Sequence, residues 1–180
     1  AERFAIYRYL VGLAKGSALG ADKRAALGAE YAALTGLDVE YVKQCSLRVG
    51  MGRFAKELLR DQDRTVGRLD SRLLGIDRDS GGSHYEYDPS MVAVDGPFSS
   101  AFQQYIRNEL SFTIERPYRT LGGVGRWKYP EGRYASVTGR LRSALTKNPY
   151  LHVLVASGYY HLAPPFFPAE YPLPRPGPPS

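Results

Sequence analysis

The chain has 180 residues, 43% of them hydrophobic and 23% charged, a composition that is typical of a folded globular protein and excludes wholesale disorder. No apolar run approaches the roughly 20 residues of a membrane-spanning helix, so the sequence predicts no membrane segment. The formal net charge is +6, but basic and acidic residues alternate, as in Arg60-Asp61-Gln62-Asp63-Arg64, which indicates solvated helix faces with ion pairs.

The N-terminal third of the chain has the pattern of a small helical unit. Apolar residues recur there at helical spacing, and we expect short helices over residues 2–15, 22–36, 38–47 and 53–62. Asp22 and Asp38 can cap the second and third of these helices, because a short acidic side chain accepts hydrogen bonds from free backbone N–H groups. Gly16 and Gly36 are suited to end the first and the second.

The remainder of the chain alternates loops with a few predicted elements. Residues 67–88 and 116–132 are rich in Gly, Ser, Asp or Pro and predict loops. Between and after them we expect helices over residues 99–110 and 137–145, then a strand over residues 152–156. The strand is short and apolar on both faces, which favours a buried position in a sheet. The Pro-rich tail of residues 172–180 can be neither helix nor central strand.

The predicted strand locates the first candidate site. In open α/β sheets, functional groups lie just beyond the carboxyl ends of the strands. The side chains in that position are Ser157, Gly158, Tyr159, Tyr160 and His161. We therefore expect the first four of them to line a substrate cleft.

Motifs in and around this segment resemble the bacterial branch of the serine carboxypeptidase family, which belongs to the α/β hydrolases. The main motif is Asn148-Pro149-Tyr150-Leu151-His152-Val153-Leu154-Val155-Ala156-Ser157-Gly158-Tyr159-Tyr160, followed by Leu-Ala-x-Pro-Phe-Phe-x-x-Glu-Tyr. Three upstream stretches, over residues 53–61, 66–72 and 87–90, are similar to that family's insertion region. The similarity extends over residues 2–171.

The resemblance implies a fold, a division of the chain and a site. The implied fold is a mostly helical α+β domain, in which residues 1–133 form a helical insertion or lid and residues 134–171 a helix–strand–loop remnant of the α/β sheet. His161 stands where the family has the catalytic Asp. The resemblance implies that the nucleophile would precede Ala1 and the catalytic base would follow Tyr171. It also implies a bacterial protein of an often exported family, although no signal peptide is recognisable.

The other reactive residues form no recognisable catalytic or metal-binding pattern. Cys45, the single cysteine, falls in a predicted helix and is typical of a buried structural thiol. Ser83 and His84 are adjacent in a Gly-rich loop, and neighbouring side chains of an extended chain point apart, so we expect no productive hydrogen bond between them. His161, Asp95 and Glu170 lack the spacing of metal ligands, and the sequence predicts neither a metal nor a cofactor.

The sequence thus predicts a truncated serine-carboxypeptidase-like hydrolase without triad activity of its own; its parent family hydrolyses peptide bonds. Two alternatives stay open. One is a genuine hydrolase of esters, peptides or glycosides whose site is built from other residues, and the other is a basic nucleic-acid-binding domain. The expected partners are a second copy, covering the edge of the lone strand, and a peptide-like or small-molecule ligand. No membrane is expected, and nucleic acid is the less favoured partner.

Overall fold

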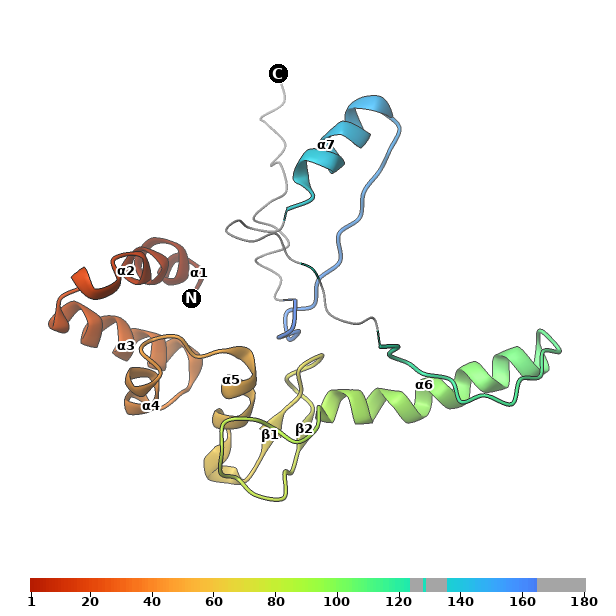
Figure 1. Cartoon of the computed structure of the whole chain (residues 1–180), viewed down its shortest axis with the longest axis horizontal. Helices are drawn as coiled ribbons and strands as arrows, with labels where there is room; N and C mark the ends of the chain where they lie inside the picture. The colour runs from red at the N-terminus through yellow and green to blue at the C-terminus, as the bar shows by residue number, and fades with distance from the viewer. Residues whose placement is uncertain (124–127, 129–135, 165–180) are drawn as a thin grey trace. The chain divides into compact units, whose positions relative to one another are not determined.

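The computed structural model describes residues 1–123, 128 and 136–164, and the chain divides into two compact units, residues 1–90 and 91–180 (Figure 1). Helices predominate among the described residues, together with a two-stranded antiparallel sheet. This confirms a mostly helical α+β fold. The predicted boundary after residue 133 and the Pro-rich tail of residues 172–180 lie outside the described residues.

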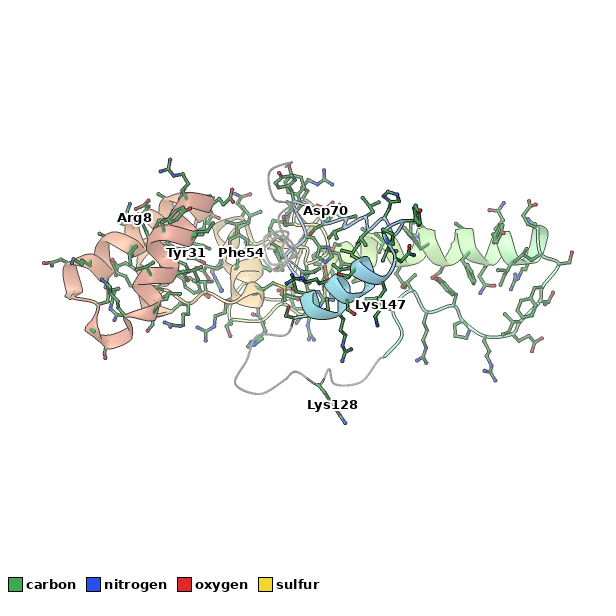
Figure 2. All side chains as sticks on the ribbon, turned by 90° about the horizontal axis from the view of Figure 1, so that it is seen from above. Arg8, Tyr31, Phe54, Asp70, Lys128 and Lys147 are labelled. Carbon is green, nitrogen blue, oxygen red and sulfur yellow. The ribbon has the colours of Figure 1, made fainter. Side chains whose placement is uncertain are left out.

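The first unit begins with one nearly continuous helix. It comprises α1 (Glu2–Phe4), a π-helical stretch (Ala5–Tyr9) and α2 (Leu10–Ala14), and a 3-10 turn (Gly16–Ala18) follows. Three further helices are α3 (Ala21–Thr35), α4 (Val39–Gln44) and α5 (Met51–Glu57), and a second 3-10 turn occupies Arg60–Gln62. Arg8 lies on the π-helical stretch, Tyr31 on α3 and Phe54 on α5, as Figure 2 shows.

The predicted helix ends are confirmed in part. Asp38 caps α4, because its Oδ1 accepts a hydrogen bond of 2.9 Å from the Tyr41 N–H. Gly36 ends α3 in the left-handed conformation, with φ of 78°. The prediction of Asp22 as a cap is wrong, since α3 begins one residue earlier, after Gly20. Asp22 lies instead in the first turn, where its charge favours the positive end of the helix.

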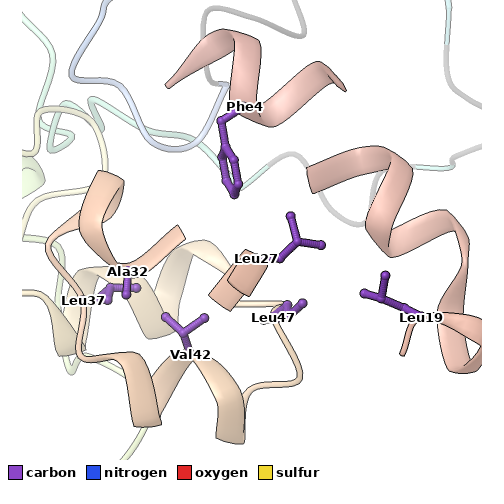
Figure 3. Packing of buried hydrophobic residues seen from close by; sticks show 7 residues of the cluster. All are labelled: Phe4, Leu19, Leu27, Ala32, Leu37, Val42 and Leu47. Atoms are coloured by element: carbon purple, nitrogen blue, oxygen red, sulfur yellow. The ribbon is translucent and has the colours of Figure 1, made fainter. Parts of the chain in front are cut away.

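The core of the first unit is formed by these helices and the loops between them (Figure 3). Its buried side chains are Phe4, Leu19, Leu27, Ala32, Leu37, Val42 and Leu47. Gly28 makes room for this packing, because a Cβ there would lie 3.2 Å from Cδ2 of Leu47. Cys45 is buried beside this core, as expected of a structural thiol.

A small hairpin follows the helices. Strand β1 (Thr65–Val66) pairs antiparallel with β2 (Leu74–Gly75), so that Thr65 faces Gly75 and Val66 faces Leu74. The prediction of an unbroken loop over residues 67–88 is therefore wrong at β2. A strand of two residues is too short to show alternation in the sequence. The position of β2 depends instead on close packing against Pro89, because a Cβ at Gly75 would lie 2.5 Å from Cγ of Pro89.

Two helices mark the rest of the chain, α6 (Pro89–Asn108) and α7 (Thr138–Lys147). α6 begins at Pro89 rather than at Ser99, since Pro suits the first position of a helix and Pro97 is accommodated inside it. The rings of Phe102 and Tyr118 stack 4.1 Å apart, which holds the following segment against α6. α7 ends at Lys147, close to the predicted end before Pro149.

The predicted strand over residues 152–156 is wrong. Residues 151–158 form neither helix nor strand, and Val153, Leu154 and Val155 are 48%, 92% and 48% exposed. A strand exists only where a neighbour takes its backbone hydrogen bonds, and no other described segment pairs with this one. No helix in the described part of the chain combines the length and the apolar character needed to cross a membrane.

Candidate functional site

The four residues predicted to line a cleft and the catalytic candidate His161 lie together in an exposed turn. Ser157 and Gly158 are the last residues of the segment 151–158, and Tyr159 and Tyr160 form the turn itself, with 81% and 51% of their surface exposed. The N–H of His161 donates a hydrogen bond of 3.2 Å to the Gly158 carbonyl, which closes the turn. Within the described residues the His161 imidazole has no hydrogen-bond partner, so the structure brings these residues together without assembling a catalytic group.

A Ser–His pair occurs elsewhere, where the sequence predicted none. Ser83 Oγ lies 3.0 Å from Nδ1 of His84, and the imidazole is exposed. The expectation that the two side chains point apart is wrong because the chain turns just before them at Gly82, whose φ is 74°. In the described part of the chain no carboxylate bonds to His84, so the pair lacks the acid that orients a catalytic base.

The most buried polar cluster joins α5 to the loop after the hairpin. The side chains of Lys56 and Asp77 are only 3% and 2% exposed and form an ion pair. Lys56 Nζ donates to Oδ2 of Asp77 and, at 2.6 Å, to the Asp79 carbonyl. Asp77 also accepts hydrogen bonds from Thr65 Oγ1 at 3.0 Å and from the Glu86 N–H at 3.3 Å.

These contacts keep Asp77 ionised. Burial is the largest single effect and by itself would raise the pKa of the Asp77 carboxyl. The hydrogen bonds from Lys56, Thr65 and the Glu86 N–H together outweigh burial, and the pKa is lowered. Sequence reasoning missed the cluster, because its partners are distant in the chain and no short-range pattern connects them.

Arg60, in the 3-10 turn after α5, holds the same loop after the hairpin in place. Its Nε donates to Oε2 of Glu57 at 2.6 Å, and its two terminal nitrogens donate to the carbonyls of Ser80 and, at 2.7 Å, of Gly82. A cavity of about 410 Å³ opens beside these groups. Its walls carry both signs of charge, with Arg64 and Arg78 among Asp63 and Asp79, so the cavity selects no ligand by net charge.

A second set of polar contacts joins the hairpin turn to the start of α6. Asp88 Oδ1 accepts the N–H of Arg68 at 3.0 Å, and Ser90 Oγ accepts the N–H of Leu69 at 2.9 Å. The turn must pass close to Ser90, because a Cβ at Gly67 would lie 2.7 Å from the Ser90 Cβ. Burial is again the largest effect on the pKa of Asp88 and would raise it, but hydrogen bonds from Ser90 and the Arg68 N–H lower it.

Neither a metal-binding group nor a known relative identifies the function of this site. Among the described residues no group of three His, Cys, Asp or Glu side chains is placed to hold a metal ion. Comparisons of the chain with protein-family models, with curated proteins and with solved structures find no match.

Proposed function

We propose that this chain is the helical, cleft-covering part of a serine-carboxypeptidase-like hydrolase, and that by itself it binds peptide-like ligands without hydrolysing them. The observation that carries the proposal is the convergence of the three upstream motif stretches in one module. Lys56, from the first stretch, binds the same carboxylate as Thr65, which immediately precedes the second. Asp88 and Ser90, from the third, accept the backbone N–H groups of the second.

The family resemblance also gives a reason why the chain would not hydrolyse a peptide. His161 occupies the position of the catalytic Asp, and an imidazole cannot hold a catalytic base in the required tautomer or stabilise the imidazolium as a carboxylate does. No Gly-x-Ser-x-Gly motif, which would present a nucleophilic serine between a strand and a helix, occurs in the 180 residues. What remains is a helical cover of the kind that shapes a cleft and excludes water from it.

The exposed segment before the turn fits the same proposal. Tyr150 and Leu154 are 86% and 92% exposed, and the apolar Val153 and Val155 on either side of Leu154 are each 48% exposed. In a hydrolase sheet a neighbouring strand would cover such a segment. In the isolated chain a second copy would cover it by pairing backbone with backbone, and a homodimer is therefore part of the proposal.

A pair of chimaeric enzymes tests the assignment of His161. In a bacterial serine carboxypeptidase, the region between nucleophile and base is replaced by residues 1–171 of this chain, with or without His161→Asp. We expect the His161→Asp chimaera to hydrolyse a blocked dipeptide, and the unchanged one to be about 10⁴-fold slower, as for the loss of a triad carboxylate. His152→Asp is the matched control and should restore nothing. Two folded chimaeras with equal rates would refute the assignment.

A second candidate function is hydrolysis at Ser83, and the contact of 3.0 Å between Ser83 Oγ and His84 Nδ1 is the observation that favours it. The experiment is labelling of the chain with a fluorophosphonate, read by intact mass. An adduct that disappears in Ser83→Ala but persists in Ser157→Ala would establish this function and overturn the first. We expect no adduct under conditions that label an ordinary serine hydrolase.

A further inference from the structure

A cavity of about 440 Å³ in the first unit carries two arginines in its wall. It is lined by Arg48, Arg53 and His84, together with Met51, Tyr85 and two glycines. No Asp or Glu lines it. Arg48 and Arg53 come from either side of the start of α5, and His84 and Tyr85 come from the loop that Lys56 and Arg60 fasten.

The two guanidinium groups of this cavity have no carboxylate partner among the described residues, whereas three arginines near it do. Arg60, Arg68 and Arg78 form ion pairs of 2.6, 3.3 and 2.8 Å with Glu57, Asp88 and Glu86. The hydrogen-bond contact of Arg53 is with Cys45 Sγ, a weak acceptor at 3.4 Å, and its charge also acts on the nearby Tyr41. Glu57 lies one helical turn after Arg53, but its carboxylate is already paired with Arg60. The cavity therefore holds two positive charges that have no ion-pair partner in the described part of the chain.

The uncharged walls indicate the rest of the ligand. A Cβ at Gly50 would meet no atom within 4 Å, so a ligand can approach the backbone there closely. The Tyr85 ring lies against Gly52, 3.9 Å from the position of a Cβ, and the Met51 side chain adds a second apolar wall. A cavity of this volume is at the lower end of the range for small-molecule sites.

We propose that this cavity binds a small organic anion, in which a carboxylate or phosphate group joins a flat apolar body. The anion lies between Arg48 and Arg53, whose planar forks match the oxygens of either group. The apolar body stacks on Tyr85. The inference stands on this cavity alone and does not use the proposed hydrolase relationship.

The test is calorimetric titration of the purified chain with matched ligands. The carboxylate arm compares N-acetylphenylalanine with its neutral amide, and the phosphate arm compares phenyl phosphate with phenol. Hydrogen bonds to charged groups correspond to about 10–100-fold in affinity. We expect at least one acid to bind about tenfold or more tightly than its neutral partner. The arm with the larger preference identifies the natural class of anion.

Variants connect the preference to the cavity. Arg48→Gln and Arg53→Gln should each reduce binding of the preferred acid about tenfold and leave the neutral partner unchanged. Arg3→Gln removes an exposed arginine outside the cavity and is the matched control, with less than a twofold effect. Circular dichroism confirms that each variant is folded. Equal binding of acid and neutral partner in both arms, no binding at millimolar concentration, or equal losses in all three variants would overturn the proposal.

Discussion

Replacement of Lys56 by Met tests the polar cluster at the centre of the first unit. The change removes the charge that balances Asp77, and both side chains are almost fully buried, at 3% and 2% exposure. Asp77 keeps only its hydrogen bonds from Thr65 and Glu86, so it becomes a buried, unpaired anion. The loss of one partner of a buried pair costs about 3–5 kcal/mol. A domain of this size has about 5–15 kcal/mol of stability in total, so the unit would be close to unfolding.

The assay is urea unfolding followed by circular dichroism at 222 nm, which reports on the helices. Lys43→Met is the matched control: its pair with Glu40 is also short, at 2.6 Å, but the side chains are 44% and 66% exposed. We expect that variant to lose less than about 0.5 kcal/mol. Lys56→Met combined with Asp77→Leu should be more stable than Lys56→Met alone, because no charge is left buried. A loss below about 1 kcal/mol in Lys56→Met would refute the reasoning.

Two further predictions concern acid and self-association. The pKa values of Asp77 and Asp88 are lowered in the folded chain, so their contribution to stability is present above the unfolded pKa of about 4 and is lost as the pH falls through the folded values. Urea unfolding at several pH values should show this loss, and Asp77→Asn should make it smaller. In sedimentation experiments we expect the chain to dimerise and Leu154→Lys to be monomeric, because a charge on the exposed segment prevents strand pairing. A monomeric parent chain would exclude the dimer.

Local patterns in the sequence sufficed for most of the helices. The apolar spacing before Gly16, the Asp38 cap and the glycine at position 36 each act within one or two turns of chain, so their effect is visible without the rest of the fold. The strand over residues 152–156 failed for the opposite reason. Its apolar residues indicate burial in a sheet, but a strand requires a partner, and composition does not supply one.

The candidate site could not be predicted from the sequence, because its contacts join residues that are far apart in the chain or depend on a turn. From its charged neighbours in the sequence, Lys56 would be expected on a solvated helix face. In the structure it is buried because it bonds to Asp77 and the Asp79 carbonyl. The hydrogen bond between Ser83 and His84 depends on the left-handed glycine before them, because it is the turn that brings two adjacent side chains together. Both features follow from how the loop over residues 77–88 is held, which sequence spacing does not report.

The same loop couples the buried pair to the proposed anion site, and this coupling can be measured. Lys56 does not line the cavity of Arg48 and Arg53, but it fastens the loop that carries Tyr85. In a Lys56→Met variant that is still folded, the apolar wall is loosened while both guanidinium groups remain. We therefore expect acid and neutral ligand to lose affinity by the same factor, so that their ratio is unchanged, whereas Arg53→Gln changes the ratio. An altered ratio in Lys56→Met would mean that the loop also places the charges, and unaltered affinities would mean that Arg60 holds Tyr85 in place without Lys56.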